Sequence, residues 1–295
     1  MTIDAVRVMR ETSVARVEYH PTLDSTNTRA AECAARGAID LPLLVVADRQ
    51  TAGRGRGGNR WWSSPGSLTF SLLIDAATVA AGEERSPLVA LAAAVAVVDC
   101  VAPLLPTHQV GIYWPNDVYV HIGQSQGGAD IPVCREELAH RGRQECLPHQ
   151  SECHQSEDHL MPDHKLAGIL VEVLPDRRHV IGIGLNVNNS LADASAELRE
   201  TAVTLRDLSG RDHDRTAVLI DLLRRLEGLF LQLRESPKEI AGRADSLCLQ
   251  RGRGLTLRWS NRTVAGVCRG IAADGAIVLE TPGGIETFLS GDVMK

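Results

Sequence analysis

The chain has 295 residues, and its 44% apolar and 23% charged residues are typical of a globular protein with one large domain and a smaller one. The formal net charge of −6 argues against bulk nucleic-acid binding, which requires a basic surface. The seven cysteines are odd in number and scattered, and residues 1–19 contain no apolar run, so we expect free thiols in a reducing cytoplasm and no signal peptide.

The first part of the chain alternates between helix and strand signals. Residues 24–27 (Asp-Ser-Thr-Asn) predict a helix N-terminus, which the alanine-rich residues 28–36 extend and Gly37 ends. Two apolar runs, 43–47 and 67–74, predict buried strands.

The most apolar stretch follows these strands. Ser86 and Pro87 suit the N-cap and first positions of a helix that continues to about Cys100. Because Asp99 and Pro103 interrupt the apolar run, it predicts a buried helix rather than a membrane span.

The middle of the chain predicts more sheet. Residues 112–120 form a strand that a Pro-Asn-Asp turn interrupts, and 165–173 with 180–186 predict a hairpin whose turn lies at 175–177. Between these strands, residues 121–164 are polar and rich in Gln, Glu, His and Cys. This composition indicates an insertion that we expect to be mobile.

The last part of the chain predicts a long helix and then a change of pattern. Residues 216–233 have one apolar face at helical spacing. From Gly254 onward, short strands alternate with turns, which is typical of a small β-barrel. We therefore predict a catalytic domain over 1–248 and a C-terminal β domain over 249–295, with a linker near 249–254.

The most informative segment is the loop at 50–58, Gln-Thr-Ala-Gly-Arg-Gly-Arg-Gly-Gly. Four glycines and two arginines in nine residues favour neither helix nor strand. A flexible loop that exposes N–H groups and two guanidinium groups suits a polyphosphate. It lacks the Gly-Lys-Ser/Thr ending of a P-loop and the helix-opening dinucleotide motif. We expect instead a mobile loop that closes over a bound nucleotide and excludes water.

Small residues mark a second region of interest. Gly168 lies three residues after Lys165, inside a strand, where a glycine indicates the close approach of a ligand or another backbone. Gly182 and Gly184 lie on one face of the next strand. They leave room for a ligand or for a bulky neighbouring side chain, and the residues alone do not decide between the two.

Five short motifs follow one another in a characteristic order. They are Asp-Ser-Thr-Asn at 24–27, Gln-Thr-Ala-Gly-Arg-Gly-Arg at 50–56, Trp-Pro-Asn-Asp at 114–117, Lys-Leu-Ala-Gly-Ile-Leu at 165–170 and Gly-Ile-Gly-Leu-Asn at 182–186. Together they resemble the biotin protein ligases over about 17–295. The resemblance implies an α+β fold, with a mixed β-sheet flanked by helices in a class II synthetase-like catalytic domain, and a small C-terminal SH3-like β-barrel.

The resemblance also implies a two-step reaction. Biotin and ATP form biotinyl-5′-AMP with release of pyrophosphate, and the biotinyl group then passes to one lysine of a biotin carboxyl carrier domain in a biotin-dependent carboxylase. The first step joins two anions, so positive charge must offset their repulsion. By motif match and charge, Arg56 and Lys165 are the catalytic cations, and a Mg²⁺ on the triphosphate would share this task. Asp117 matches a position that could orient the acceptor amine or accept its proton.

The remaining site residues come from the same motif matches. The biotin-binding residues would be Ser25, Thr26, Gln50, Gly53, Arg54, Gly168, Leu170 and Gly184. The ATP or adenylate would contact Arg54, Arg56, Lys165 and Asn186. Gln50 would face biotin, while Arg54 and Arg56 would face phosphate.

The chain departs from the family pattern in three places. Few residues precede Asp24, too few for the winged helix-turn-helix of bifunctional members, so we expect a monofunctional ligase that does not bind operator DNA. Asn59 stands where relatives often have a basic residue. The insertion at 121–164 separates Asp117 from Lys165, which are only a few residues apart in relatives.

The insertion contains candidate zinc ligands, namely Cys146, His149, Cys153 and His154. Their spacing matches no clean zinc pattern, so a Gln- and His-rich excursion without metal is the favoured interpretation.

Two other functions remain open. A lipoate-type protein ligase shares the catalytic fold, although the Gly-Arg-Gly-Arg loop and the C-terminal β domain argue against it. A non-catalytic sensor of biotin or its adenylate is the other, and Arg56, Lys165 and Asp117 argue against that. The oligomeric state is not predicted by any feature of the sequence.

Overall fold

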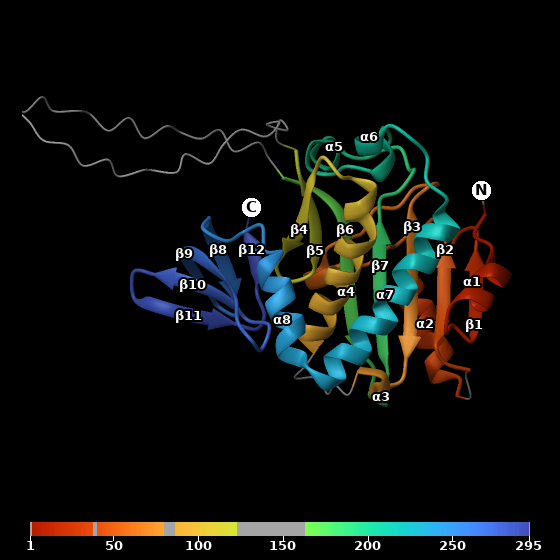
Figure 1. The fold of residues 1–295 in the computed structure, drawn as a ribbon, viewed down its shortest axis with the longest axis horizontal. Helices are drawn as coiled ribbons and strands as arrows, with labels where there is room; N and C mark the ends of the chain where they lie inside the picture. Colours follow the sequence, from red (N-terminus) through yellow and green to blue (C-terminus); the bar gives the residue numbers. More distant parts are fainter. Residues whose placement is uncertain (1, 38–39, 80–85, 123–162, 295) are drawn as a thin grey trace, which may run out of the picture.

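The computed structural model describes residues 2–37, 40–79, 86–122 and 163–294 (Figure 1). In these residues the chain forms a larger α+β domain and a smaller, separate β-sheet at its C-terminal end. Figure 1 shows the smaller sheet beside α8 and β4, at the opposite end of the larger sheet from the N-terminus.

Seven strands of the described chain form the mixed sheet of the larger domain, in the order β1-β2-β3-β7-β6-β5-β4. β1 and β2 pair in parallel, and the other neighbouring strands pair antiparallel. The strands are β1 (Arg16–His20), β2 (Leu43–Ala47), β3 (Leu68–Ile74), β4 (Gln109–Tyr113), β5 (Asp117–His121), β6 (Asp163–Val173) and β7 (His179–Leu185).

Helices cover both faces of this sheet, because successive strand residues point to opposite sides. Leu44 and Val46 of β2 join the main core with α4 and α7, which lie in front of the sheet in Figure 1. Leu43 and Val45 point to the other face and pack against α2. The helices are α1 (Ala5–Glu11), α2 (Thr26–Ala35), α3 (Ala76–Val79), α4 (Ser86–Val101), α5 (Ala196–Thr201), α6 (Leu205–Ser209), α7 (Arg215–Glu235) and α8 (Pro237–Ser246), with short 3-10 turns η1 (Arg56–Gly58) and η3 (Ala102–Leu104).

The apolar helix α4 is a core element. By length and composition alone Pro87–Leu104 could cross a membrane, but 72% of this stretch is buried inside the protein. α4 packs against α7, α8 and β6. It is therefore the buried helix that the sequence predicts.

The C-terminal domain is an antiparallel sheet in the order β11-β10-β9-β8-β12. Trp259 of β8 and Phe288 of β11 come from strands that are not neighbours in this sheet, yet their rings make an edge contact with centroids 5.7 Å apart. The sheet therefore curves back on itself as in a small barrel. Its strands are β8 (Gly254–Trp259), β9 (Arg262–Ile271), β10 (Ile277–Thr281), β11 (Gly284–Phe288) and β12 (Asp292–Met294).

The segment before β8 is packed rather than loose. The Ile112 N–H of β4 donates to the Leu247 carbonyl at 2.7 Å, and the Leu249 N–H donates to the Ile112 carbonyl at 3.1 Å. These bonds extend the larger sheet by one short segment. The predicted linker at 249–254 thus begins as an ordered connection between the two domains.

Trp114 joins the domains directly. It is 2% exposed, and its indole Nε1 donates to the Gly275 carbonyl of the C-terminal domain at 3.0 Å. Its backbone N–H donates to the Gln250 side-chain oxygen at 2.7 Å. A buried indole with a satisfied N–H stabilises such a junction through both its area and its hydrogen bond.

The helices α1, α3, α5, α6 and α8 and the strand β1 are not predicted from the sequence. The structure also shortens the predicted insertion at 121–164. His121 ends β5 and Asp163 begins β6, and these two residues are paired across the strands. The interior, 123–162, lies outside the described residues.

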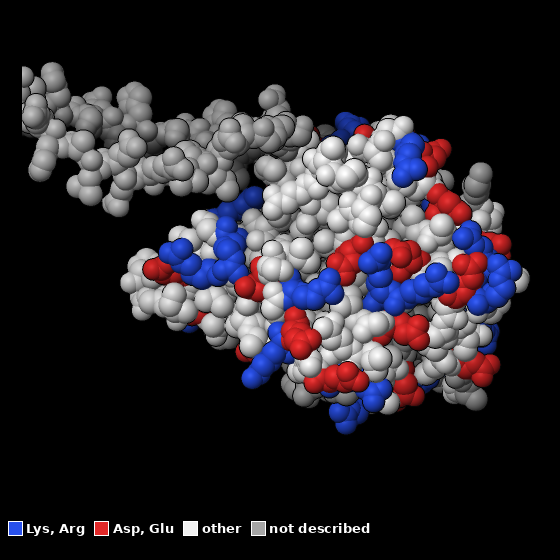
Figure 2. All heavy atoms as spheres, viewed as in Figure 1, with Lys and Arg blue, Asp and Glu red and all other residues white. Residues whose placement is uncertain are grey.

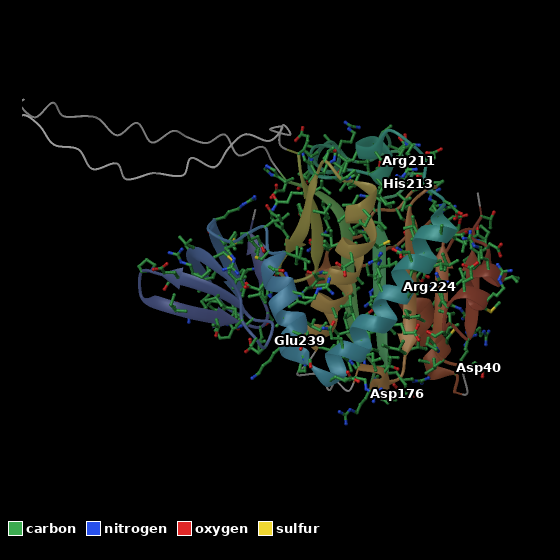
Figure 3. All side chains as sticks on the ribbon, in the orientation of Figure 1. Asp40, Asp176, Arg211, His213, Arg224 and Glu239 are labelled. Carbon is green, nitrogen blue, oxygen red and sulfur yellow. The ribbon has the colours of Figure 1, made fainter. Side chains whose placement is uncertain are left out.

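Charges of both signs are interspersed on the face shown in Figure 2. Ion pairs of the helices include Arg225–Asp221 within α7 and Arg243 of α8 with Asp99 of α4. The two ends of the larger domain are marked in Figure 3 by Asp176, at the β6–β7 turn, and by His213, which follows α6. The hairpin turn lies where the sequence predicts it.

The β4 junction yields a stability prediction. A Cβ on Gly111 would lie 2.5 Å from the Leu247 carbonyl oxygen, so Gly111→Ala should destabilise the protein by about 1–3 kcal/mol in chemical denaturation. Gly228→Ala is the matched control, because the α7 position has open space around it and should gain about 0.5–1 kcal/mol. Equal stability of the two variants would contradict the packed junction.

Candidate active site

A cavity of about 490 Å³ lies between the larger sheet, the loop at 50–58 and the C-terminal domain. Its size is that of a pocket for a small organic ligand. It lies on the sheet face that α2 partly covers, opposite α4 and α7. The predicted site residues that line it are Ser25, Thr26, Gln50, Arg54, Arg56, Asp117, Lys165, Gly168, Leu170 and Gly184.

Two predicted residues do not line this cavity. Gly53 lines a neighbouring hollow formed mainly by the loop itself. Asn186 is buried, and its side-chain oxygen accepts a hydrogen bond from the Asn189 amide at 3.2 Å. The candidate zinc ligands Cys146, His149, Cys153 and His154 lie outside the described residues. Among the residues that are described, no group of three or more His, Cys, Asp or Glu side chains could hold a metal ion.

Glycines form the sheet surface beneath the cavity. Gly168 of β6 pairs with Gly184 of β7, so two residues without side chains lie next to each other. The indole of Trp61 covers them: a Cβ on Gly184 would lie 2.2 Å from Trp61 Cε2, and one on Gly168 would lie 3.1 Å from Trp61 Cζ3. Of the two interpretations that the sequence left open here, the structure shows the bulky neighbour.

Lys165 and Asp117 form an ion pair at one end of the cavity, with Nζ and Oδ2 2.6 Å apart. The pairing of β5 with β6 brings them together, because Asp117 pairs with Gly168 and Lys165 pairs with Tyr119 on the same two strands. The Asn116 amide donates to the Ile169 carbonyl at 2.5 Å, which holds the turn against β6. The pair is partly exposed, so both charges are available to a ligand in the cavity.

Arg56 links the loop to the C-terminal domain. Its Nη1 donates to the Gly291 carbonyl oxygen at 2.7 Å. Burial lowers the pKa of its guanidinium, whereas the nearby carboxylates of Asp292 and Asp117 act in the opposite direction. A partly desolvated cation next to an ion pair is suited to stabilise an anion.

At the other end of the cavity, the side chains of Gln50, Thr26 and Ser25 are polar and uncharged. The Gln50 side-chain oxygen accepts from the Thr26 N–H at 2.7 Å and lies 3.1 Å from its hydroxyl. The Gln50 N–H donates to the Ser63 hydroxyl at 2.7 Å. Ser25, the N-cap of α2, accepts from the Thr28 N–H. These buried groups present fixed donors and acceptors, which suit a neutral polar ligand group.

Arg54 makes its contacts with β6 and α2 rather than with the Lys165–Asp117 ion pair. Its guanidinium forms a salt bridge with Glu172 of β6, and Nη1 donates to the Thr28 hydroxyl at 3.4 Å. Glu172 belongs to none of the five sequence motifs. Its position in the strand could have indicated a place near the cavity, because Gly168, Leu170 and Glu172 alternate and therefore share one sheet face.

A second cluster that sequence reasoning missed surrounds Asp163, whose side chain is fully buried. Tyr113 donates to it at 2.7 Å, and His121 and Arg253 each lie 2.6 Å away. Burial raises the pKa of the Asp163 carboxyl, but these hydrogen bonds outweigh burial and lower the pKa below its usual value. The cluster fixes the ends of β5 and β6 beside the cavity.

Comparison with known proteins identifies the fold. The sequence model described as "Biotin/lipoate A/B protein ligase family" matches residues 19–188, and that described as "Biotin protein ligase C terminal domain" matches 252–295. A solved structure of the Aquifex aeolicus biotin protein ligase in complex with biotin and ATP is similar with a TM-score of 0.71 and 26% identity, covering 95% of this chain and 98% of that one.

Sequence relatives point the same way. The chain is 31% identical to a Mycobacterium tuberculosis protein named biotin–[acetyl-CoA-carboxylase] ligase, over 92% of this chain and 85% of that protein. It is 29% identical to the bifunctional ligase/repressor BirA of Bacillus subtilis, over 93% of this chain and 72% of that protein. The chain belongs to the biotin/lipoate A/B protein ligase family. Within that family it is a biotin protein ligase by its C-terminal domain and its relatives, which confirms the resemblance and the fold class expected from the motifs.

The contact between Trp61 and the glycines yields a prediction. Gly184→Ala should displace the indole, shifting the tryptophan emission and destabilising the protein by about 1–3 kcal/mol. Gly242→Ala in α8, where no atom lies within 4 Å, should leave the emission unchanged. Emission equal to wild type in Gly184→Ala would show that Trp61 does not lie on this strand.

Proposed function

We propose that this protein activates biotin with ATP to biotinyl-5′-AMP, releasing pyrophosphate, and then transfers the biotinyl group to a lysine of a biotin carboxyl carrier domain. The observation that carries the proposal is the arrangement of one cavity. Its charged end holds Lys165, Asp117 and Arg56, and its neutral polar end holds Gln50 and Thr26. An adenylate of a compact, uncharged bicyclic ring system needs these two environments, joined in one pocket.

The first step needs positive charge at the reacting phosphorus. The biotin carboxylate oxygen attacks the α-phosphate, a new O–P bond forms, and the bond to pyrophosphate breaks. Arg56 and Lys165 would offset the repulsion of the two anions and stabilise the charge on the leaving pyrophosphate. Arg54, also predicted at the phosphates, pairs with Glu172 in this structure, and its phosphate contact stays a prediction, as does the adenylate contact of Asn186.

The neutral end suits biotin. Thr26, Gln50 and Ser25 would hydrogen-bond the ureido group, and Leu170 would form part of the apolar wall. Fixed dipoles of this kind orient a ligand with little reorganisation. The biotin contacts of Gly53, Gly168 and Gly184 stay predictions, because Trp61 covers Gly168 and Gly184 in this structure and Gly53 lines the neighbouring hollow.

The second step requires a neutral acceptor amine. Its nitrogen attacks the biotinyl carbonyl carbon, the C–O bond to phosphate breaks, and AMP leaves with the bonding pair. Asp117 would orient the amine or accept the proton that it loses. This role is compatible with the ion pair, because Lys165 touches Asp117 through Oδ2 and leaves Oδ1 available.

The donor groups present suit Mg²⁺. This ion is usually bound by one or two carboxylates together with substrate phosphates. Asp117 and Asp292 line the cavity and would face a Mg²⁺ that enters with the triphosphate. The ion would supply additional positive charge to the phosphates. We also propose that the enzyme acts in the cytoplasm, does not bind DNA, and has a biotin-dependent carboxylase as its partner.

The function is tested with a carrier-domain fragment, ATP, Mg²⁺ and either biotin or lipoate. We expect mass spectrometry to show the mass of one biotinyl group on the fragment and none with lipoate. A carrier fragment whose acceptor lysine is replaced by arginine is the control. Lipoyl transfer would favour the lipoate-type alternative, and adenylate binding without any transfer would favour a sensor.

The role of Lys165 is tested by Lys165→Ala. Removing the cation that faces the phosphates should lower pyrophosphate release by about 10²–10³-fold, while biotin binding by calorimetry stays close to wild type. Lys238→Ala removes an exposed lysine of α8 and should have no effect on either measurement. Normal pyrophosphate release in Lys165→Ala would refute the assignment.

A further inference from the structure

Glu172 uses both carboxylate oxygens to join two parts of the site. Oε1 pairs with Arg54 of the loop, and Oε2 accepts from the Asn27 amide at 2.7 Å. Asn27 belongs to the first turn of α2 and is 4% exposed. One carboxylate on β6 therefore holds both the loop at 50–58 and the helix that carries the neutral end of the cavity.

The contacts continue from Asn27 to the start of the loop. The Asn27 side-chain oxygen accepts from the Ser71 hydroxyl at 2.6 Å, and Ser71 Oγ lies 2.7 Å from the Thr26 hydroxyl. Thr26 in turn contacts the Gln50 oxygen. The chain of side-chain contacts thus runs from Arg54 to Thr26, and the Thr26 backbone N–H makes the last link to Gln50 on the same loop.

Proton counting gives this chain one direction. Because the Glu172 carboxylate only accepts, Asn27 must turn its NH₂ group toward it and its oxygen toward Ser71. Ser71 has one proton and gives it to Asn27, so it accepts from Thr26. The Gln50 oxygen accepts the Thr26 N–H, which leaves the Gln50 NH₂ group to donate to a ligand.

Asn27 has no room to adopt another arrangement. A Cβ on Gly182 would lie 2.0 Å from its side-chain oxygen, so the amide rests directly on the β7 backbone. An exposed salt bridge alone contributes little to stability. The contacts of Glu172 differ from an exposed salt bridge, because its second partner, Asn27, is buried. Asn27 loses its only charged acceptor when the carboxylate is changed.

We propose that Glu172 is a positioning residue for the biotin end of the site. It holds the loop at 50–58 over the cavity through Arg54. Through Asn27 it also holds the first turn of α2, whose Thr26 N–H orients the Gln50 side chain. The inference rests on the proposed function, because it assigns the neutral end of the cavity to biotin. It predicts that Glu172 controls biotin affinity and leaves the phosphate chemistry of Lys165 and Arg56 unchanged.

The test compares Glu172→Gln with wild type. A glutamine offers one oxygen and one NH₂ group, so it cannot accept from both Arg54 and Asn27. We expect the KM for biotin to rise about tenfold, with kcat and the KM for ATP within about twofold of wild type. Arg54→Ala should raise the biotin KM similarly, and the double variant should be no worse than the more impaired single variant.

Glu286→Gln is the matched control. Glu286 pairs with Arg262 on the C-terminal domain and is 35% exposed, against 29% for Glu172, so the same substitution breaks a similar salt bridge away from the cavity. It should leave both KM values unchanged. A fall in kcat in Glu172→Gln, an equal rise in the KM values for biotin and ATP, or additive effects with Arg54→Ala would overturn the positioning role.

A ligand-free measurement separates this inference from the proposed function. Limited proteolysis with subtilisin, followed by mass spectrometry, should cut within 54–60 faster in Glu172→Gln than in wild type or Glu286→Gln. Equal cutting rates would overturn the inference whatever the enzyme does. Failure of the wild-type protein to release pyrophosphate with biotin and ATP would instead overturn the proposed function.

Discussion

The site depends on a strip of sheet that carries no side chains. At Gly168, Gly182 and Gly184 a single methyl group would lie 2.0–3.1 Å from Trp61 or Asn27. The Trp61 indole and the Asn27 amide therefore contact the backbone of β6 and β7 directly, in space that side chains would otherwise occupy. Antiparallel pairing keeps the glycines adjacent, so the depth of the cavity follows from the register of the sheet.

The charged end depends on the sheet as well. Lys165 and Asp117 lie on neighbouring strands, and the turn that carries Asp117 also carries Trp114, which binds the C-terminal domain. The same short motif therefore sets the ion pair and anchors the second domain. Arg56 completes the arrangement by bonding to Gly291 of that domain, so the loop and both domains meet at one place.

The sequence could predict features that depend on local pattern. The α7 helix follows from apolar periodicity, and α4 from a Ser-Pro start and a continuous apolar run. The β6–β7 hairpin follows from two apolar runs around a turn. The β1 strand was missed because it is an edge strand with weak alternation. The α8 helix was missed although Ser236-Pro237 repeats the start signal seen at Ser86-Pro87. Motif order was sufficient to collect most of the residues that line the cavity.

Partnerships across the fold could not be predicted in this way. Glu172 and Asp292 are ordinary charged residues of strands, and only tertiary contacts place them next to Arg54 and Arg56. The same holds for the buried carboxylate of Asp163, whose partners come from three different strands or loops. Local sequence also could not decide whether the glycines face a ligand or Trp61, because either partner requires a small residue.

The position of the C-terminal strand has a practical consequence. Residues 291–294 line the cavity, whereas the N-terminus lies at the other end of the larger sheet (Figure 1). An affinity tag or fusion partner joined after β12 would emerge at the rim of the cavity and compete with incoming molecules for space. One joined before α1 would emerge far from it, which makes the N-terminal end the better attachment point for immobilising or labelling the enzyme.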